Sequence, residues 1–153
     1  MKPIYIFDLD GTLALHHHRL HHILNSKDYL AFEQACTEDT PNQPVMSILH
    51  SLCEGVPSAE IWFVTGRSNI VRQQTVTWLW GYTPLTQRYI EAHLFMRPIG
   101  DKRKDNVVKE EWLLQQSKAF RSRICAVFED RQRVVDMWRK NGVTCLQVAE
   151  GNF

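Results

Sequence analysis

Four side chains near the ends of apolar runs, and a lysine within a helical pattern, have the types and spacing that phosphoryl transfer requires. Asp8 and Asp10 follow the run IYIF: the first carboxylate can act as a nucleophile, and the second lies close enough to exchange protons with the leaving group and with water. Thr65, after EIWFV, offers a hydroxyl group, and Lys109 offers a positive charge for the phosphoryl oxygens. Asp130, close behind ICAVF, could join Asp8 and Asp10 in binding a hard divalent cation such as magnesium, because the cation relieves the repulsion between carboxylates.

The alternation of apolar runs with helical patterns predicts the elements that position these side chains. We expect buried strands at residues 4–7, 60–64, 124–128 and 143–148, with a weaker candidate at 94–96. Helical spacing covers residues 44–54, 68–80, 105–118 and 131–141, and residues 37–44 are expected to form a loop. This order predicts one α/β domain with a parallel sheet, whose ligands bind beyond the carboxyl ends of the strands.

The composition narrows the class of protein. The chain has 153 residues, of which 44% are hydrophobic and 23% charged, as in ordinary globular domains. A net charge of +1 excludes a grossly basic nucleic-acid coat, so any polyanion must be held by a local patch. We expect neither a membrane span nor a signal peptide. The scattered cysteines, without any CxxC, indicate reduced thiols and a cytoplasmic protein.

Four motifs in order resemble those of haloacid dehalogenase superfamily phosphatases: DLDGTL at 8–13, VTGR at 64–67, Lys109, and EDR at 129–131. The resemblance implies a Rossmann-like parallel sheet, an aspartyl-phosphate intermediate on Asp8, acid and base catalysis by Asp10, and Mg²⁺. The segments RKDNVVKEEW (103–112) and 129–153 are more closely similar to the 3′-phosphatase domain of phage-type polynucleotide kinase-phosphatases. This second resemblance covers essentially the whole chain.

The subfamily resemblance also implies roles for further residues. At three positions the chain departs from the pattern of the family. Arg19 and the Gly66-Arg67 pair are expected to bind substrate, and Asp105 to support Lys109. Glu129 and Asn106 each stand where an aspartate is usual, and Thr65 replaces a serine. No GxxxxGK[ST] loop occurs, so we expect the phosphatase domain, residues 1–153, without the kinase.

Each of these residues also has an ordinary structural interpretation. Aspartates before glycine are common in turns, and Thr65, Asp105 and Asp130 could simply cap helices. Lys109, Arg19 and Arg67 could be solvated surface charges. The tryptophans at helical spacing are expected in the core rather than as stacking platforms for bases; they are Trp78, Trp80, Trp112 and Trp138. The run Lys102-Arg103-Lys104 could follow a nucleic-acid backbone or form a solvated turn.

These inferences lead to an expected function. We expect a magnesium-dependent phosphatase that removes 3′-phosphates from DNA or RNA ends or from 3′-nucleotides, with only a small helical insertion, about residues 23–54, and no large cap over the site. A homodimer and a separate kinase or ligase partner are open alternatives. One rival is a nucleotidase or sugar phosphatase for small molecules. The other is a non-catalytic module that binds nucleic-acid ends.

Five histidines lie close behind the first motif, at positions 16, 17, 18, 21 and 22. A dedicated metal site needs three or four positioned ligands, and no acid or cysteine partner is evident in this segment. In the family, the segment after the nucleophile motif forms a flap over the active site. The histidines are therefore expected to line the entrance around Arg19 and to add positive charge under mildly acidic conditions.

Overall fold

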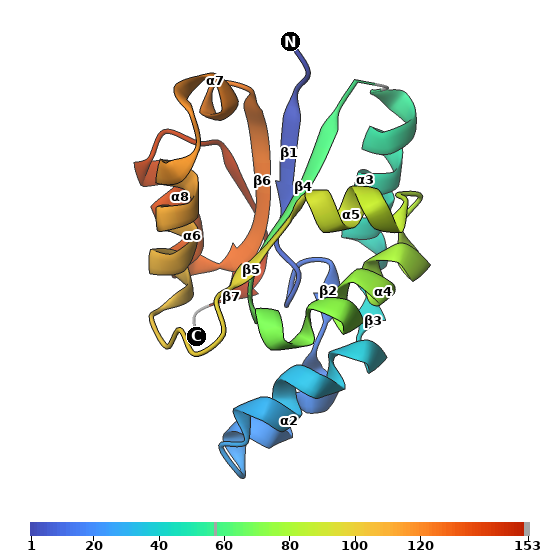
Figure 1. Ribbon diagram of the computed structural model, residues 1–153, viewed down its shortest axis with the longest axis vertical. Helices are drawn as coiled ribbons and strands as arrows, with labels where there is room; N and C mark the ends of the chain where they lie inside the picture. Colours follow the sequence, from blue (N-terminus) through green and yellow to red (C-terminus); the bar gives the residue numbers. More distant parts are fainter. Residues whose placement is uncertain (57, 152–153) are drawn as a thin grey trace.

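A five-stranded parallel sheet forms the centre of the molecule (Figure 1). The structure is a computed structural model that describes residues 1–56 and 58–151. The strand order is β5-β4-β1-β6-β7. The strands are β1 (Ile4–Phe7), β4 (Glu60–Ser68), β5 (Leu94–Arg97), β6 (Ile124–Arg131) and β7 (Cys145–Gly151). This is the expected α/β fold.

The central strand β1 is buried because its side chains are apolar on both faces. Ile4, Ile6 and Phe7 are all fully buried. Phe7 pairs in register with Phe63 of β4 and Phe128 of β6, and its ring stacks on that of Phe128 with centroids 4.4 Å apart. This packing aligns the carboxyl ends of the three strands, where the polar residues begin.

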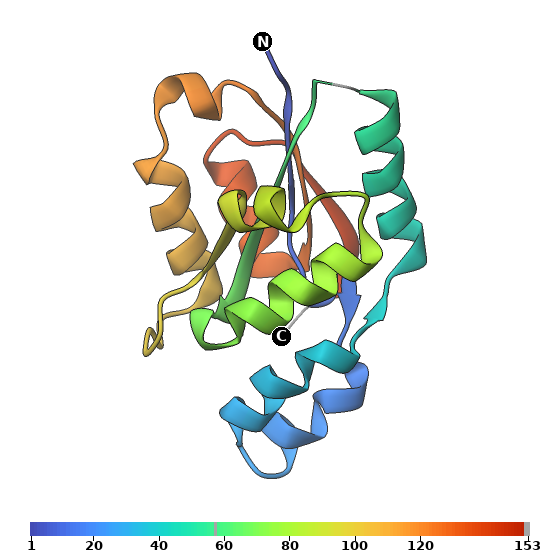
Figure 2. The ribbon, with the colours of Figure 1, turned by 45° about the vertical axis from the view of Figure 1, so that its right-hand side comes forward.

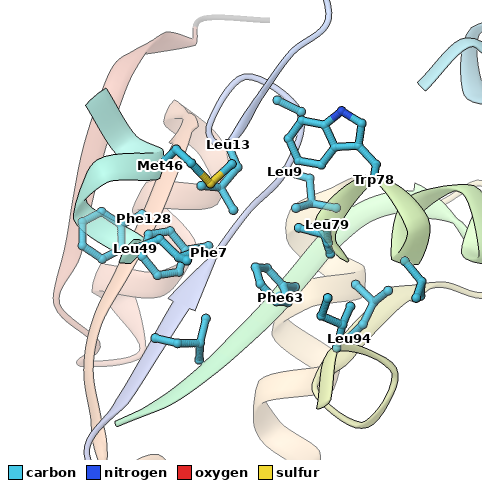
Figure 3. Close-up of a cluster of buried hydrophobic side chains, with 14 of the residues drawn as sticks. Phe7, Leu9, Leu13, Met46, Leu49, Phe63, Trp78, Leu79, Leu94 and Phe128 are labelled. Atoms are coloured by element: carbon cyan, nitrogen blue, oxygen red, sulfur yellow. The ribbon is translucent and has the colours of Figure 1, made fainter. Parts of the chain in front are cut away.

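Helices cover both faces of the sheet (Figures 1 and 2). One layer contains α3 (Gln43–Gly55), α4 (Arg72–Tyr82) and α5 (Gln87–Ala92). The other contains α6 (Asp105–Gln115), α7 (Lys118–Arg121) and α8 (Gln132–Lys140). Figure 3 shows the core under the first layer, where Leu49 of α3 and Leu79 of α4 pack with Phe7 and Phe63. A second cluster, which includes Trp138, lies under the other layer.

Four short helical segments lie beyond the carboxyl ends of the strands (Figures 1 and 2). They are η1 (His17–Arg19), α1 (His21–Leu24), α2 (Tyr29–Gln34) and η2 (Ala35–Glu38). Their stem is an antiparallel pair of two-residue strands, β2 (Ala14–Leu15) and β3 (Thr40–Pro41). Since α3 packs into the core, these four segments are the part of the chain that projects toward the polar ends of the strands.

The structure corrects several details of the predicted elements. The expected loop at 37–44 is wrong, because it contains the end of η2, all of β3 and the start of α3. The helix predicted at 68–80 begins as the 3₁₀ segment η3 (Asn69–Val71), and the one at 105–118 ends at Gln115. There the chain turns, and Ser117 caps α7 by accepting the backbone N–H of Phe120 at 3.1 Å.

Three of the four tryptophans expected in the core are buried, and one is not. Trp78, Trp112 and Trp138 are at most 5% exposed, whereas Trp80 is 55% exposed on the outer side of α4. The α4 pattern has tryptophans on both sides of Leu79, so only one of that pair faces the sheet. The four cysteines are free thiols, and no helix among the described residues is long and apolar enough to cross a membrane.

Replacing Trp138 by alanine tests the second core cluster. Because Trp138 is fully buried, Trp138→Ala should lower the free energy of unfolding by about 3–5 kcal/mol. The matched change Trp80→Ala removes an exposed side chain and should cost no more than about 0.5 kcal/mol. Urea unfolding of both variants measures the difference, and equal costs would contradict the packing described here.

Candidate active site

A buried lysine links two carboxylates from neighbouring strands. Asp8 follows β1, Glu129 lies near the end of β6, and Lys109 comes from α6 between them. The Lys109 Nζ donates to Asp8 Oδ1 at 2.6 Å and to Glu129 Oε2 at 2.6 Å. Burial alone would lower the pKa of Lys109, but the two carboxylates outweigh it and raise this pKa. The lysine is therefore a fixed positive charge in the site rather than a solvated surface group.

Asp8, Glu129 and Asp130 form an acidic cluster in which each residue offers an oxygen within 4.8 Å of the others. Burial is the main cause that raises the pKa of Asp8 to about 7, that of Glu129 to about 7 and that of Asp130 to about 6. With Lys109, three carboxylates and one ammonium leave a net charge of −2 when all are ionised, which a divalent cation would balance.

Glycine at position 11 is needed for this cluster to form. Its φ is +88°, and a Cβ there would lie 2.1 Å from Asp130 Oδ2. The chain thus passes directly against the carboxylate of Asp130. This contact explains the DxDG order in the first motif: Gly11 lets the loop after Asp10 close over β6.

Glu129 has two sets of contacts, which its extra methylene group allows. Its Oε2 accepts from Lys109, and its Oε1 accepts the backbone N–H groups of Asp130 and Arg131 at 3.2 and 3.3 Å. Glu129 therefore orients Lys109 and the end of β6 as well as contributing charge to the acidic cluster. The supporting role predicted for Glu129 stays a prediction, which these contacts would allow.

The carboxylate of Asp10 points away from the acidic cluster, toward two arginines. Arg19 Nη2 donates to Asp10 Oδ1 at 2.5 Å, and Arg67 donates to the same carboxylate through Nε at 3.0 Å and Nη2 at 2.7 Å. Burial by itself raises the pKa of Asp10, but Arg67 and Arg19 hold this pKa well below its usual range. The predicted metal role of the Asp10 side chain is not supported by this position.

Asp39, which was not predicted from the sequence, is the second carboxylate that binds Arg19 and Arg67. Its Oδ1 accepts from Arg19 Nε at 2.7 Å, and its Oδ2 accepts from Arg19 Nη2 at 2.7 Å and Arg67 Nη2 at 2.5 Å. Both arginines are at most 1% exposed, so two buried cations lie between two carboxylates. Trp78 of α4 fixes the backbone by donating its indole N–H to the Asp39 carbonyl oxygen at 2.7 Å. No local pattern in TEDTP marks Asp39; the only available signal was the need to balance two buried arginines.

The predicted phosphate loop lies at the end of β4. Thr65 is buried, and its Oγ1 accepts the backbone N–H of Arg67 at 3.2 Å, so it is a strand residue and not the cap of the next helix. Ser68 caps η3 instead. A Cβ on Gly66 would lie 3.3 Å from the Cβ of Asp105, so a larger residue at this position would crowd Asp105.

Asp105 lies in the first turn of α6, after the N-cap residue Lys104. Its carboxylate forms ion pairs with Arg131 at 2.5 Å and Arg133 at 2.7 Å. Asp105 thereby joins α6, which holds Lys109, to the start of α8. The cap interpretation is wrong, and the supporting role of Asp105 rests on these contacts.

The histidines lie in pairs and not in one cluster: the ring of His16 stacks beside that of His17, and the ring of His21 lies 4.0 Å from that of His22. His18 Nε2 lies 2.8 Å from Asp39 Oδ1, and His16 is buried beside the edge of the Phe32 ring. The Phe32 ring also covers the guanidinium carbon of Arg19 at 4.2 Å. Next to it, Glu33 accepts the backbone N–H of Ser68, so α2 contacts both Arg19 and the end of β4. The metal-ligand cluster found among the described residues contains no histidine.

Comparison with known proteins agrees with these features. The family model described as the polynucleotide kinase PNKP phosphatase domain matches residues 2–153. The chain is 32% identical over 132 residues to a protein of Autographa californica nuclear polyhedrosis virus named as a bifunctional polynucleotide kinase/RNA ligase. That match covers 86% of this chain and 17% of the viral protein. The chain therefore spans about a sixth of the curated relative that it matches.

Solved structures show the same fold. A chain in the structure of the Pnkp1/Rnl/Hen1 RNA repair complex is 31% identical, with a TM-score of 0.77 over 99% of this chain and 44% of that one. A second structure of the Pnkp1/Rnl/Hen1 complex gives 30% identity and a TM-score of 0.76, over 99% and 48%. The class C acid phosphatase from Bacillus anthracis, with tungstate bound, shares the fold at 13% identity and a TM-score of 0.66, over 99% and 68%.

Magnesium should stabilise the protein through the acidic cluster. At about 100 times its Kd, a bound ion adds about 2.7 kcal/mol, or roughly 5–10 °C in Tm for a chain of this size. Asp130→Asn should abolish this shift, and without metal its Tm should equal or exceed that of the wild type because repulsion is relieved. Thermal unfolding with Mg²⁺ and with EDTA measures both effects. Asp136→Asn, an exposed position on α8, is the control, and an undiminished shift in Asp130→Asn would contradict the site.

Proposed function

The chain belongs to the family of polynucleotide kinase PNKP phosphatase domains, phosphoric monoester hydrolases of the haloacid dehalogenase superfamily, and from this premise we propose that it removes 3′-phosphates from polynucleotide ends. We propose further that the reaction depends on Mg²⁺ held by the acidic cluster and proceeds through an aspartyl-phosphate on Asp8. The cation would supply charge neutralisation for the phosphoryl oxygens.

One observation carries this proposal: two carboxylates, two residues apart, have opposite environments. Burial, together with the neighbouring acid Glu129, raises the pKa of Asp8 to about 7, whereas two arginines hold the pKa of Asp10 far lower. Such a separation assigns different chemical roles to two carboxylates. Asp8 is the nucleophile, because it lies beside Lys109 and the acidic cluster, and Asp10 is the acid and base.

In the first step, an oxygen of Asp8 attacks phosphorus and the bond from phosphorus to the 3′-oxygen breaks. Asp10 must carry a proton to give to this oxygen. An arriving phosphate dianion favours that protonation in two ways, since it repels the Asp10 carboxylate and competes for the N–H groups of Arg19 and Arg67. The substrate-binding role predicted for the arginines is compatible with this exchange of partners.

In the second step, Asp10 takes a proton from water, which attacks phosphorus and releases phosphate from Asp8. The arginines favour the ionised form of Asp10 that this step needs, and Asp39 holds them in place. Lys109 would stabilise negative charge on the phosphoryl oxygens, and the Thr65 hydroxyl would orient the phosphate loop.

The comparisons also suggest partners. The viral relative is named for kinase and ligase activities, and the solved relatives belong to an RNA repair complex. We therefore propose that this domain acts on RNA or DNA ends together with a kinase or ligase, on the same or a separate chain.

A comparison of phosphorylated ends tests the proposed function. We expect Mg²⁺-dependent release of phosphate from a 3′-phosphorylated oligonucleotide. Its kcat/KM should be at least about 100-fold above that for the 5′-phosphorylated oligonucleotide or a sugar phosphate. A difference of about 2.7 kcal/mol in transition-state binding gives discrimination of this size. Asp8→Asn should abolish turnover while leaving Tm within a few degrees.

Three other outcomes would contradict the proposal. Equal rates on all esters would indicate a phosphatase for small molecules. Tight binding of ends without phosphate release would indicate a binding module. Substantial turnover by Asp8→Asn would exclude the covalent intermediate.

A further inference from the structure

We propose that a basic rim beside the active site binds the phosphodiester backbone of the strand whose 3′ end is being processed. We define the basic rim as six residues that lie at the ends of β5 and β6, in the loop before α6 and at the start of α8: Arg97, Lys102, Arg103, Lys104, Arg131 and Arg133. This inference rests on the proposed function and adds to it the surface that would distinguish a polynucleotide from a mononucleotide.

The rim begins next to the acidic cluster. Arg131 directly follows Asp130 in the chain, and both Arg131 and Arg133 contact Asp105 at the start of α6. Lys104 is the N-cap residue of the same helix, one turn before Lys109. A strand whose terminal phosphate lies at Asp8 must leave the site across one of its edges, and this edge carries the positive charge.

The charge of the rim stands out against that of the whole chain. Three described carboxylates form ion pairs with it, those of Asp101, Asp105 and Glu111. Six cations and three carboxylates leave a net charge of +3, whereas the complete chain has a net charge of only +1. The rest of the chain is therefore net negative, and a polyanion would be attracted to this edge.

The individual contacts show which charges a ligand can reach. Arg103 is already paired with Asp101 at 2.6 Å and Glu111 at 2.7 Å. Lys102 and Lys104 are exposed, and neither has a side-chain ion pair or hydrogen bond within residues 1–56 and 58–151. Arg133 contacts Asp105 and is still 40% exposed. The two lysines are thus the clearest candidates for phosphate contacts.

The loop that carries the lysines is held in a defined shape. Arg97 donates through Nε to the carbonyl oxygen of Gly66 at 2.8 Å, and through Nη1 to the carbonyl oxygens of Asp101 at 3.4 Å and Arg103. The Asp101 carboxylate accepts the backbone N–H of Arg103 at 2.9 Å. One guanidinium thus ties the loop to the glycine of the phosphate loop. Lys102 and Lys104 are presented on an ordered backbone, which lowers the entropy cost of binding.

A charge-matched pair of double variants tests the rim. Lys102→Gln/Lys104→Gln removes the two unpaired lysines, and Lys118→Gln/Lys140→Gln removes two exposed lysines from α7 and the end of α8, toward the amino ends of the strands and away from the acidic cluster (Figure 1). Fluorescence anisotropy with EDTA present measures the affinity for a 3′-phosphorylated ten-nucleotide strand. Turnover with Mg²⁺ is measured on the same strand and on a 3′-phosphorylated mononucleotide.

If the rim binds the strand, removing its lysines should lower the affinity and raise the KM for the long substrate only. Lys102→Gln/Lys104→Gln should weaken binding of the ten-nucleotide strand at least about fivefold at low salt and reduce the slope of log K against log salt by about 1.4. Its kcat and its KM for the mononucleotide should not change. The control variant should match the wild type on both substrates.

Three results separate this inference from the proposed function. A wild-type affinity that does not increase with strand length would overturn the rim, and so would equal losses in both double variants. If the strand binds through the rim but no phosphate is released from any 3′-phosphorylated substrate, the rim stands and the proposed function fails.

Discussion

The structure depends on holding three buried carboxylates and one lysine together at the carboxyl ends of β1 and β6. Burial disfavours the ionised form of each acid and the like charges repel one another, and the raised pKa values of Asp8, Glu129 and Asp130 express these costs. The apolar strands supply the rigidity that keeps the acids close, through the stacked rings of Phe7 and Phe128. Lys109 offsets one charge, and the remaining two are the negative charge that the proposed divalent cation would balance.

A second set of charges is balanced separately, and this separation gives Asp10 its different environment. Arg19 and Arg67 lie between Asp10 and Asp39, so both cations and both carboxylates are paired. Breaking a buried pair of this kind is costly, because the partner's charge remains unpaired. The segment from η1 to η2 provides Arg19 and precedes Asp39, while Arg67 comes from β4. The segment from η1 to η2 therefore completes the site as well as flanking it.

The sequence could predict the parts that depend on local pattern. Apolar runs identified the five strands of the sheet, and the motif residues Asp8 and Asp130 meet as expected because parallel strands end at one edge, where Lys109 of α6 joins them. Asp39 could not be found in this way, since its importance arises from arginines 20 and 28 positions away. The exposure of Trp80 likewise depends on which face of α4 meets the sheet, which periodicity alone did not decide.

Burst kinetics distinguish the roles that we propose for Asp8 and Asp10. p-Nitrophenolate leaves without needing a proton, so Asp10→Asn should still form the aspartyl-phosphate from p-nitrophenyl phosphate but hydrolyse it slowly. The account predicts a burst of about one nitrophenolate per enzyme, then slow turnover, with phosphate found on Asp8 after acid quenching. Asp8→Asn should give no burst. An Asp10→Asn enzyme without a burst and without bound phosphate, or a burst in Asp8→Asn, would contradict the account.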